Sequence, residues 1–225
     1  MMSKAIPFLL ASLAALTALT ALGGVSAAQA QDAAAGEKKA AMCIGCHSIV
    51  GYQASFPEVH KVPMIAGQGA KYIVASLTAY KKGERKHPTM RGIAGSLSDI
   101  DMADLAVYYE RQNASMVKPV ADAPAVTPSA DVAALLAKGA CASCHGANYN
   151  KPIDPGYPKI AGQHADYLAV ALHAYSVQGN PQVGRGNAIM AGQVKQFKRE
   201  ELKAMAKYIA SLPGGLSTVP QARFR

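Results

Sequence analysis

The pattern Cys-x-x-Cys-His occurs twice in this chain, and the two copies hold all four of its cysteines. Two cysteines three residues apart lie on one side of a helical turn, and the histidine that follows reaches toward the same side. A c-type haem needs two thiols for its vinyl groups and one ligand for its iron, so this pattern is typical of covalent haem attachment. The sequence therefore predicts two haem groups. The expected attachment residues are Cys43, Cys46, Cys141 and Cys144, and the expected iron ligands are His47 and His145.

Other uses of paired cysteines fit the sequence less well. A zinc site needs four clustered ligands, whereas the two pairs are about 98 residues apart. A redox-active Cys-x-x-Cys usually occurs in a βαβ setting, which this sequence lacks. Disulfides are common in exported proteins, but two Cys-x-x-Cys-His motifs, each beginning a helical repeat, favour haem over a disulfide.

The chain also repeats itself with a period close to 100 residues, which is far longer than a solenoid repeat. The segment 63–68 resembles 158–163, and both contain Ile-Ala-Gly-Gln. Further matched pairs are Tyr72 with Tyr167, Leu77 with Leu172, Tyr80 with Tyr175, Met90 with Met190, Gly92 with Gly192 and Tyr108 with Tyr208. We predict two domains of one fold, at 31–118 and 131–225. The Pro-rich segment 119–130 is expected to be a semi-extended linker between them.

The spacing of apolar residues is helical, and no segment alternates as a half-buried strand would, so the expected fold is all-α. A helix is predicted over 68–82, with Gly83 ending it. Another is predicted over 99–112, with Ser98 and Asp101 as its N-terminal cap. Lys198 stands where the first copy has Ser98, so the matching helix is expected to be capped less well. The expected inward residues are Tyr72, Ile73, Leu77, Tyr80, Ile100, Leu105, Tyr108, Ala169, Leu172, Tyr175, Leu202, Met205 and Ile209.

Only one methionine pair and one histidine pair match between the two copies. Met90 and Met190 are therefore the predicted sixth ligands, 43 and 45 residues after the histidine of their own motif. Iron held by His and Met is an electron-carrier arrangement, with a raised potential and no open coordination site. Met64 is expected to be a loop side chain, and Met102 and Met205 core filler.

The surroundings of each iron can also be predicted. A ligating histidine normally donates its second ring N–H to a carbonyl or carboxylate, and the carbonyls of Pro63 and Pro158 are the candidates. Ile65 and Ile160 are expected to pack on the porphyrin. The four repeated tyrosines, Tyr72, Tyr80, Tyr167 and Tyr175, fit either core packing or hydrogen bonds to haem propionates.

The N-terminus reads as an export signal. Lys4 precedes a long uncharged stretch rich in Leu, Ala and Thr, and Ala28–Ala30 is an A-x-A cleavage site. A signal peptide over 1–30 is predicted, with an uncleaved membrane anchor as the alternative. The net charge of +9 is spread over a chain with only 16% charged residues, too dilute for a nucleic-acid-binding arm. Residues 131–225 carry 11 Lys and Arg against 5 Asp and Glu, so this half is the expected docking face. Its basic residues Lys195, Lys198, Arg199 and Lys203 fit either this role or a solvated basic helix.

These residues resemble the class I cytochromes c. Each copy has the order of that family: a first helix, Cys-x-x-Cys-His, Pro-x-aliphatic-x-Gly, a middle helix, a methionine loop and a last helix ending in a motif such as 105–108 or 205–208. The doubled unit, with Ala-Gly-Gln before a Tyr-bearing helix in both copies, is similar to the dihaem cytochrome c4 family. One departure is Ala134 where the first copy has Gly36, the small residue expected where the first and last helices cross.

The resemblance implies two tandem class I cytochrome c domains, each wrapped around one covalent haem, and a periplasmic, non-enzymatic electron carrier of a respiratory chain. Its donor would be a quinol-oxidising cytochrome complex or a dehydrogenase, and its acceptor a terminal oxidase or another periplasmic protein. Peripheral membrane association stays open. The alternatives are a dedicated cytochrome subunit of a flavocytochrome sulfide dehydrogenase or alcohol dehydrogenase, and a dihaem peroxidase, which would need an iron site that opens.

Overall fold

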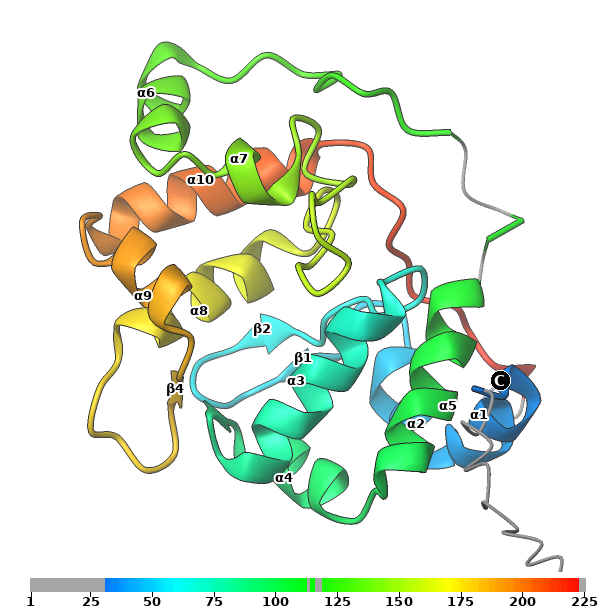
Figure 1. Ribbon diagram of the computed structural model, residues 1–225. Helices are drawn as coiled ribbons and strands as arrows, with labels where there is room; N and C mark the ends of the chain where they lie inside the picture. Colours follow the sequence, from blue (N-terminus) through cyan, green and yellow to red (C-terminus); the bar gives the residue numbers. More distant parts are fainter. Residues whose placement is uncertain (1–30, 113, 116–118, 223–225) are drawn as a thin grey trace, which may run out of the picture. The chain divides into compact units, whose positions relative to one another are not determined.

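The computed structural model describes residues 31–112, 114–115 and 119–222, so the predicted signal peptide lies outside the described residues. Residues 31–225 belong to one compact unit (Figure 1). The helices of the first repeat are α1 (Ala33–Lys39), α2 (Ala41–His47), α3 (Ala70–Lys82), α4 (Pro88–Gly95) and α5 (Asp99–Arg111). Those of the second are α6 (Ala130–Lys138), α7 (Ala142–His145), α8 (Ala165–Ser176), α9 (Ala188–Val194) and α10 (Arg199–Ser211). In the part of the chain that the structure describes, no helix is long and apolar enough to cross a bilayer.

The helical predictions are confirmed for the two long helices of the first repeat. α3 ends at Gly83, whose φ of 76° is the left-handed conformation that glycine adopts without a steric penalty. α5 begins at Ser98, whose hydroxyl accepts from the Asp101 N–H at 3.1 Å, while the Asp101 carboxylate accepts from the Ser98 N–H at 2.9 Å. At α10 the Lys198 N–H donates to Glu201, but the Lys198 side chain cannot return a bond, so this cap is half complete, as predicted.

Each repeat has a core of its own. In the first, Ile44 of α2, Ile73 of α3 and Leu105 of α5 pack together. In the second, Leu136, Leu168, Leu202 and Ile209 do so, from α6, α8 and α10. The predicted inward position of Ile100 is wrong, because its side chain is 46% exposed. The buried face of α5 instead consists of Met102, Leu105, Ala106 and Tyr109, which share one side of the helix at spacings of three and four residues.

The crossing of α1 and α5 requires the glycine that the sequence supplies. A Cβ atom at Gly36 would lie 2.2 Å from the carbonyl oxygen of Asp104, well inside van der Waals contact. The side chain of Asp104 holds the same crossing, because it accepts from the Asp32 N–H at 2.9 Å and from Lys39 Nζ at 2.7 Å. In the second repeat Ala134 is exposed, and α6 packs on the core through Leu136 instead.

The structure also contains strands that the sequence did not predict. Two-residue strands β1 (Gln53–Ala54) and β2 (His60–Lys61) pair antiparallel within the first repeat. β3 (Arg85–Lys86) pairs antiparallel with β4 (Gly184–Arg185), and this pairing joins the two repeats. Strands of two residues are too short to show an alternating pattern, so the sequence carries no signal for them.

Candidate haem-binding sites

A cavity of about 640 Å³ is lined by residues of both repeats. That volume lies in the usual range for cofactor pockets. Apolar side chains from the middle helices and the loops before them form much of its wall, among them Ile65, Leu77, Ile160 and Leu172. All eight residues predicted from the sequence line it: Cys43, Cys46, His47, Met90, Cys141, Cys144, His145 and Met190.

The two motif histidines are held in the same way. The Nδ1–H of His47 donates to the carbonyl of Pro63 at 2.8 Å, and that of His145 donates to Pro158 at 3.1 Å. The predicted proline acceptors are therefore confirmed. Burial lowers the pKa of both imidazoles, although the proline carbonyls oppose the shift. Each ring is thus neutral at pH 7 with Nε2 free to bind a metal, which is the form that ligates iron.

The four cysteines are half-buried, and none of them forms a disulfide. Burial raises the pKa of Cys43 and of Cys141, so these thiols are protonated at neutral pH. A redox-active or zinc-binding cysteine needs the opposite shift. Among the described residues there is also no group of three or more His, Cys, Asp or Glu that could hold a metal ion. The paired thiols therefore suit thioether attachment to a haem.

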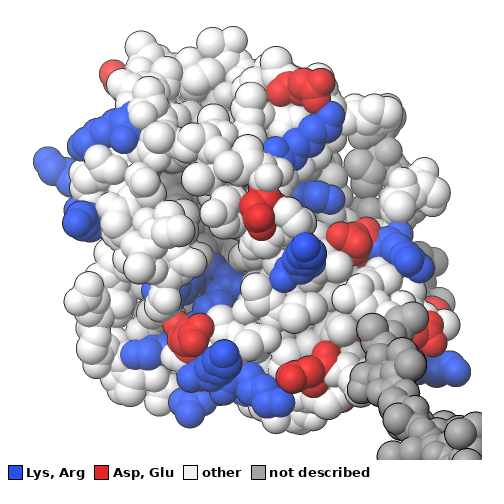
Figure 2. Space-filling model, in the orientation of Figure 1, with Lys and Arg blue, Asp and Glu red and all other residues white. Residues whose placement is uncertain are grey.

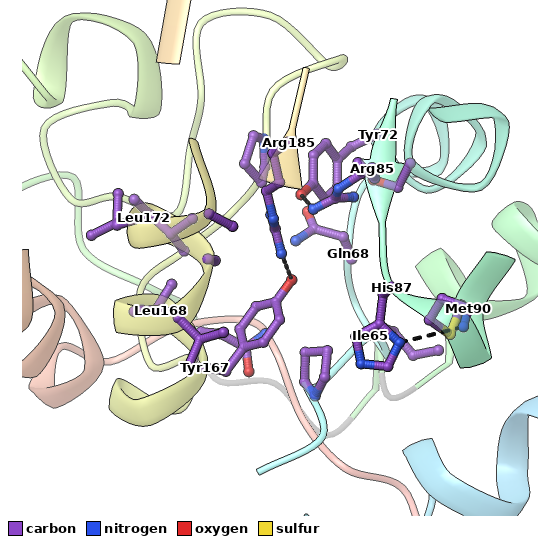
Figure 3. A pocket seen from close by; sticks show the side chains of 18 of the residues that line it. Ile65, Gln68, Tyr72, Arg85, His87, Met90, Tyr167, Leu168, Leu172 and Arg185 are labelled. Carbon is purple, nitrogen blue, oxygen red and sulfur yellow. Dashed lines mark hydrogen bonds between the residues drawn. The ribbon is translucent and has the colours of Figure 1, made fainter. Parts of the chain in front are cut away.

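Both candidate methionines are the third residue of a short helix. The Met90 N–H donates to Nδ1 of His87 at 3.5 Å at the start of α4 (Figure 3). The Met190 N–H donates to Oδ1 of Asn187 at 2.9 Å at the start of α9. Met90 and Met190 are half-buried. Met102 and Met205 are 1% and 3% exposed in the two cores, which confirms them as packing residues.

Sequence reasoning missed two arginines that the structure places on the cavity wall. Arg85 donates to the hydroxyl of Tyr72 at 3.1 Å, and Arg185 donates to that of Tyr167 at 3.1 Å (Figure 3). Burial alone would raise the pKa of Tyr72, but the charges of Arg85 and Arg185 lower it to about 8. The internal repeat could have identified this pair, because Arg85 and Arg185 are 100 residues apart, the same offset that relates Met90 to Met190.

A second missed pair is Gln68 and Gln163, the last residues of the repeated Ala-Gly-Gln. Gln68 accepts from the backbone N–H of Lys159 at 3.0 Å and donates to its carbonyl at 2.9 Å. Gln163 makes the same two bonds to Met64, at 3.0 and 2.8 Å. Each glutamine therefore binds the backbone of the other repeat, and we call these four bonds the glutamine clasp.

Comparison with known proteins agrees with this site. A family model for cytochrome c matches residues 129–213. The chain is 33% identical to cytochrome c4 of Pseudomonas aeruginosa over 187 residues, covering 81% of this chain and 90% of that protein. It is 31% identical over 186 residues to a thiosulfate dehydrogenase electron acceptor of Stutzerimonas stutzeri, covering 79% of this chain and 82% of that protein.

The fold is similar to a crystal structure of reduced recombinant cytochrome c4 from Pseudomonas stutzeri, with a TM-score of 0.57 and 29% identity over 81% of this chain and all of that one. The paired thiols, the carbonyl-held imidazoles and the apolar cavity all fit a covalently bound haem in each repeat. The all-α architecture expected from the sequence is likewise that of two class I cytochrome c domains. The chain is a dihaem electron-transport protein with haem c attached at two sites, and it belongs to the cytochrome c4 family.

Proposed function

We propose that this protein carries electrons in a periplasmic respiratory chain, with iron held by His47 and Met90 in one haem site and by His145 and Met190 in the other. The observation that carries the proposal is the fixed orientation of both imidazoles. Each is neutral and bound at Nδ1 to a proline carbonyl, and each lines a cavity that a methionine of the same repeat also reaches.

Bound haem supplies a one-electron couple between ferrous and ferric iron. The residues of this chain set its conditions. The thioether bonds to cysteine fix the porphyrin, and the proline carbonyls fix the imidazole rings and raise their basicity. Apolar side chains such as Ile65 and Ile160 exclude water from the porphyrin. Two protein ligands on each iron leave no coordination site for peroxide, which argues against a dihaem peroxidase.

The export signal over 1–30 and the domain limits at 31–118 and 131–225 are part of this proposal. The predicted linker 119–130 fits this role over 119–129, which contain no helix or strand and are held to the second repeat through side chains, whereas its last residue, Ala130, begins α6. The Asn148 amide donates to the carbonyl of Ala121 at 2.6 Å, and the hydroxyl of Tyr208 donates to that of Val126 at 2.9 Å. The protein's electron donor would be a quinol-oxidising cytochrome complex or a dehydrogenase, and its electron acceptor a terminal oxidase or another periplasmic protein.

A second candidate is a dedicated electron acceptor of one dehydrogenase. The likeness to a thiosulfate dehydrogenase electron acceptor favours this reading. Size-exclusion chromatography of native periplasmic extract, followed by haem absorbance, separates the two. A free carrier elutes at the mass of one processed chain with its two haems, and a subunit elutes with its enzyme.

The ligand assignment has a direct test. Met90→His and Met190→His should each remove one thioether–iron charge-transfer band and lower one haem potential, because imidazole stabilises ferric iron more than a thioether does. Met64→Leu is the matched control, since Met64 contacts the other repeat through its backbone. Loss of a band in Met64→Leu, or two intact bands in Met90→His, would contradict the assignment.

A further inference from the structure

The glutamine clasp binds the same peptide groups that orient the motif histidines. The carbonyl of Pro63 accepts from the Nδ1–H of His47 at 2.8 Å. The N–H of that same peptide group belongs to Met64, and it donates to Oε1 of Gln163 at 3.0 Å. Because a trans peptide directs its C=O and its N–H in opposite directions, His47 and Gln163 approach it from opposite sides. One peptide group therefore joins a histidine of the first repeat to a glutamine of the second.

The second haem site has the same arrangement, with the repeats exchanged. The carbonyl of Pro158 accepts from the Nδ1–H of His145 at 3.1 Å. The N–H of the same peptide group is that of Lys159, and it donates to Oε1 of Gln68 at 3.0 Å. We call the two chains of hydrogen bonds, from His47 to Gln163 and from His145 to Gln68, the peptide relays. Each relay begins at a motif histidine and ends at a side chain of the opposite repeat.

Both glutamine side chains are held firmly where the relays end. Gln68 and Gln163 are 5% and 4% exposed, so little water competes for their amides. Each Oε1 also accepts from the next backbone N–H of its own repeat, that of Gly69 or His164, at 3.0 Å. Each Nε2 donates to a carbonyl of the other repeat, at 2.9 and 2.8 Å. The acceptor oxygen of each relay is therefore fixed in position by bonds to both repeats.

A relay of this kind acts on the imidazole through the peptide group. Hydrogen bonds in a chain polarise one another, so a peptide whose N–H donates to a buried oxygen has a more negative carbonyl. A stronger acceptor for Nδ1–H makes the imidazole a more basic ligand. A more basic ligand stabilises ferric iron relative to ferrous iron, and the haem potential falls. Loss of the glutamine bond should reverse each of these effects.

We propose that Gln68 and Gln163 are positioning residues that tune the haem of the opposite repeat. Gln163 lowers the potential of the haem at His47, and Gln68 lowers that of the haem at His145. The inference rests on the proposed ligation of iron by these two histidines, but not on which residues are the sixth ligands.

The relays consist of uncharged groups, which separates their effect from that of nearby charges. Figure 2 shows basic side chains inside the hollow on the face that it presents. A change in such a charge acts through space and would reach both haems. Replacing glutamine by leucine alters no charge and keeps most of the side-chain volume, but it removes the acceptor oxygen. An effect of this replacement on one haem only is therefore the signature of a relay.

The experiment is a redox titration of the full haem-loaded protein followed by NMR, in which the haem methyl signals report each haem separately. Gln163→Leu should raise the potential of the first haem and leave the second unchanged, and Gln68→Leu should do the opposite. Gln112→Leu is the matched control, because its amide bonds to Tyr108 inside the first repeat, and it should move neither potential. Equal shifts at both haems, a shift confined to the glutamine's own repeat, or no larger shift than in Gln112→Leu would overturn the proposal.

A second readout follows the hydrogen bond itself. In reduced protein labelled with ¹⁵N-histidine, the Nδ1–H proton signal of His47 should move upfield in Gln163→Leu, because a weaker hydrogen bond shields the proton more. The signal of His145 should stay in place. If Gln163→Leu does not fold, Gln163→Asn keeps an amide but shortens its reach by one methylene, and it should move the His47 signal in the same direction. An unmoved His47 signal in the folded variant would overturn the relay.

Oxidation of the native protein tests the ligation of iron independently of the glutamines. The ring signals of His47 and His145 should then leave the diamagnetic range, because the unpaired spin of ferric iron reaches its ligands. Absence of that change would refute the ligation and the relays together. Its presence, with unmoved Nδ1–H signals in the glutamine variants, would overturn the relays alone.

Discussion

The glutamine clasp should determine how firmly the two repeats are held together. Gln68 and Gln163 are 5% and 4% exposed, and each makes two hydrogen bonds to the backbone of the other repeat. Gln68→Ala removes the two bonds to Lys159 and leaves its N–H and carbonyl without their partners. At about 1 kcal/mol for each bond, with part of a desolvation penalty added, the loss is about 2–3 kcal/mol.

Urea unfolding of the haem-loaded protein measures this loss. With a slope of about 2–3 kcal/mol per molar urea, the midpoint should fall by about 1 M. Gln163→Ala should cause a similar fall, because its bonds to Met64 have nearly the same lengths. In the double variant Gln68→Ala/Gln163→Ala, the unfolding curve followed by Soret absorbance or by far-UV circular dichroism should split into two transitions, because the repeats then unfold with less coupling.

Gln112→Ala is the matched control. Its amide donates to the hydroxyl of Tyr108 at 3.0 Å, so this bond stays inside the first repeat. We expect it to cost about 1 kcal/mol or less and to leave the transition unsplit. If Gln68→Ala and Gln112→Ala shift the midpoint equally, the clasp does not hold the repeats together and the reasoning fails.

Three other outcomes follow from the structure. Gly36→Ala should lower the free energy of unfolding by about 1–3 kcal/mol in urea titrations, because the new Cβ overlaps the Asp104 carbonyl oxygen; an unchanged midpoint would contradict the close crossing of α1 and α5. The N–H of Asp32 and the ammonium of Lys39 lower the pKa of Asp104. Its carboxylate therefore stabilises the fold at any pH above about 4, the ordinary pKa of an aspartate. This stabilisation is lost as the pH falls through the lowered pKa of Asp104. As the pH falls below about 4, the stability of Asp104→Asn in urea titrations should therefore fall less than that of the native protein, and an identical pH profile would refute this role. Electron transfer to an acidic acceptor, measured by stopped-flow kinetics, should slow as ionic strength rises. At low ionic strength Lys198→Glu should slow it more than Lys82→Glu, and equal effects would remove the second repeat as the docking face.

One residue of the predicted docking face, Arg199, is already paired with a carboxylate of the other repeat. Arg199 donates to both carboxylate oxygens of Glu58, at 2.6 and 2.5 Å, so its charge is paired across the repeats. Lys195, Lys198 and Lys203 are exposed. Because a paired charge contributes little to long-range steering, the lysines are the better targets for charge reversal.

Local sequence patterns correctly predicted the features that depend on residues close together in the chain. The caps at Ser98 and Gly83, the helices they bound and the proline acceptors for the motif histidines are confirmed. The position of Ile100 was predicted wrongly, because one apolar residue at the first turn of a helix does not show which face the core will cover.

Contacts between the repeats were outside the reach of such patterns. The roles of Arg85 and Gln68 depend on partners about 90 to 100 residues away, and no local periodicity encodes that distance. The repeat itself contained the information, because both residues recur in the second copy. The assignment of Met90 and Met190 as iron ligands stays a prediction.

The reciprocity of the glutamine clasp has a consequence for the origin of the molecule. Gln68 binds Lys159, and their counterparts in the other repeat, Gln163 and Met64, bind each other in the same way. Such reciprocal contacts are typical of a two-fold symmetric homodimer. A single-haem ancestor that paired with itself and then duplicated in tandem would leave this pattern, with the linker converting an encounter between molecules into an intramolecular one. Covalent fusion also frees the two sides to diverge. Lys159 donates a bond from Nζ to the carbonyl of Gly67 that its counterpart Met64 cannot return, so the approximate two-fold relation holds between two unequal repeats.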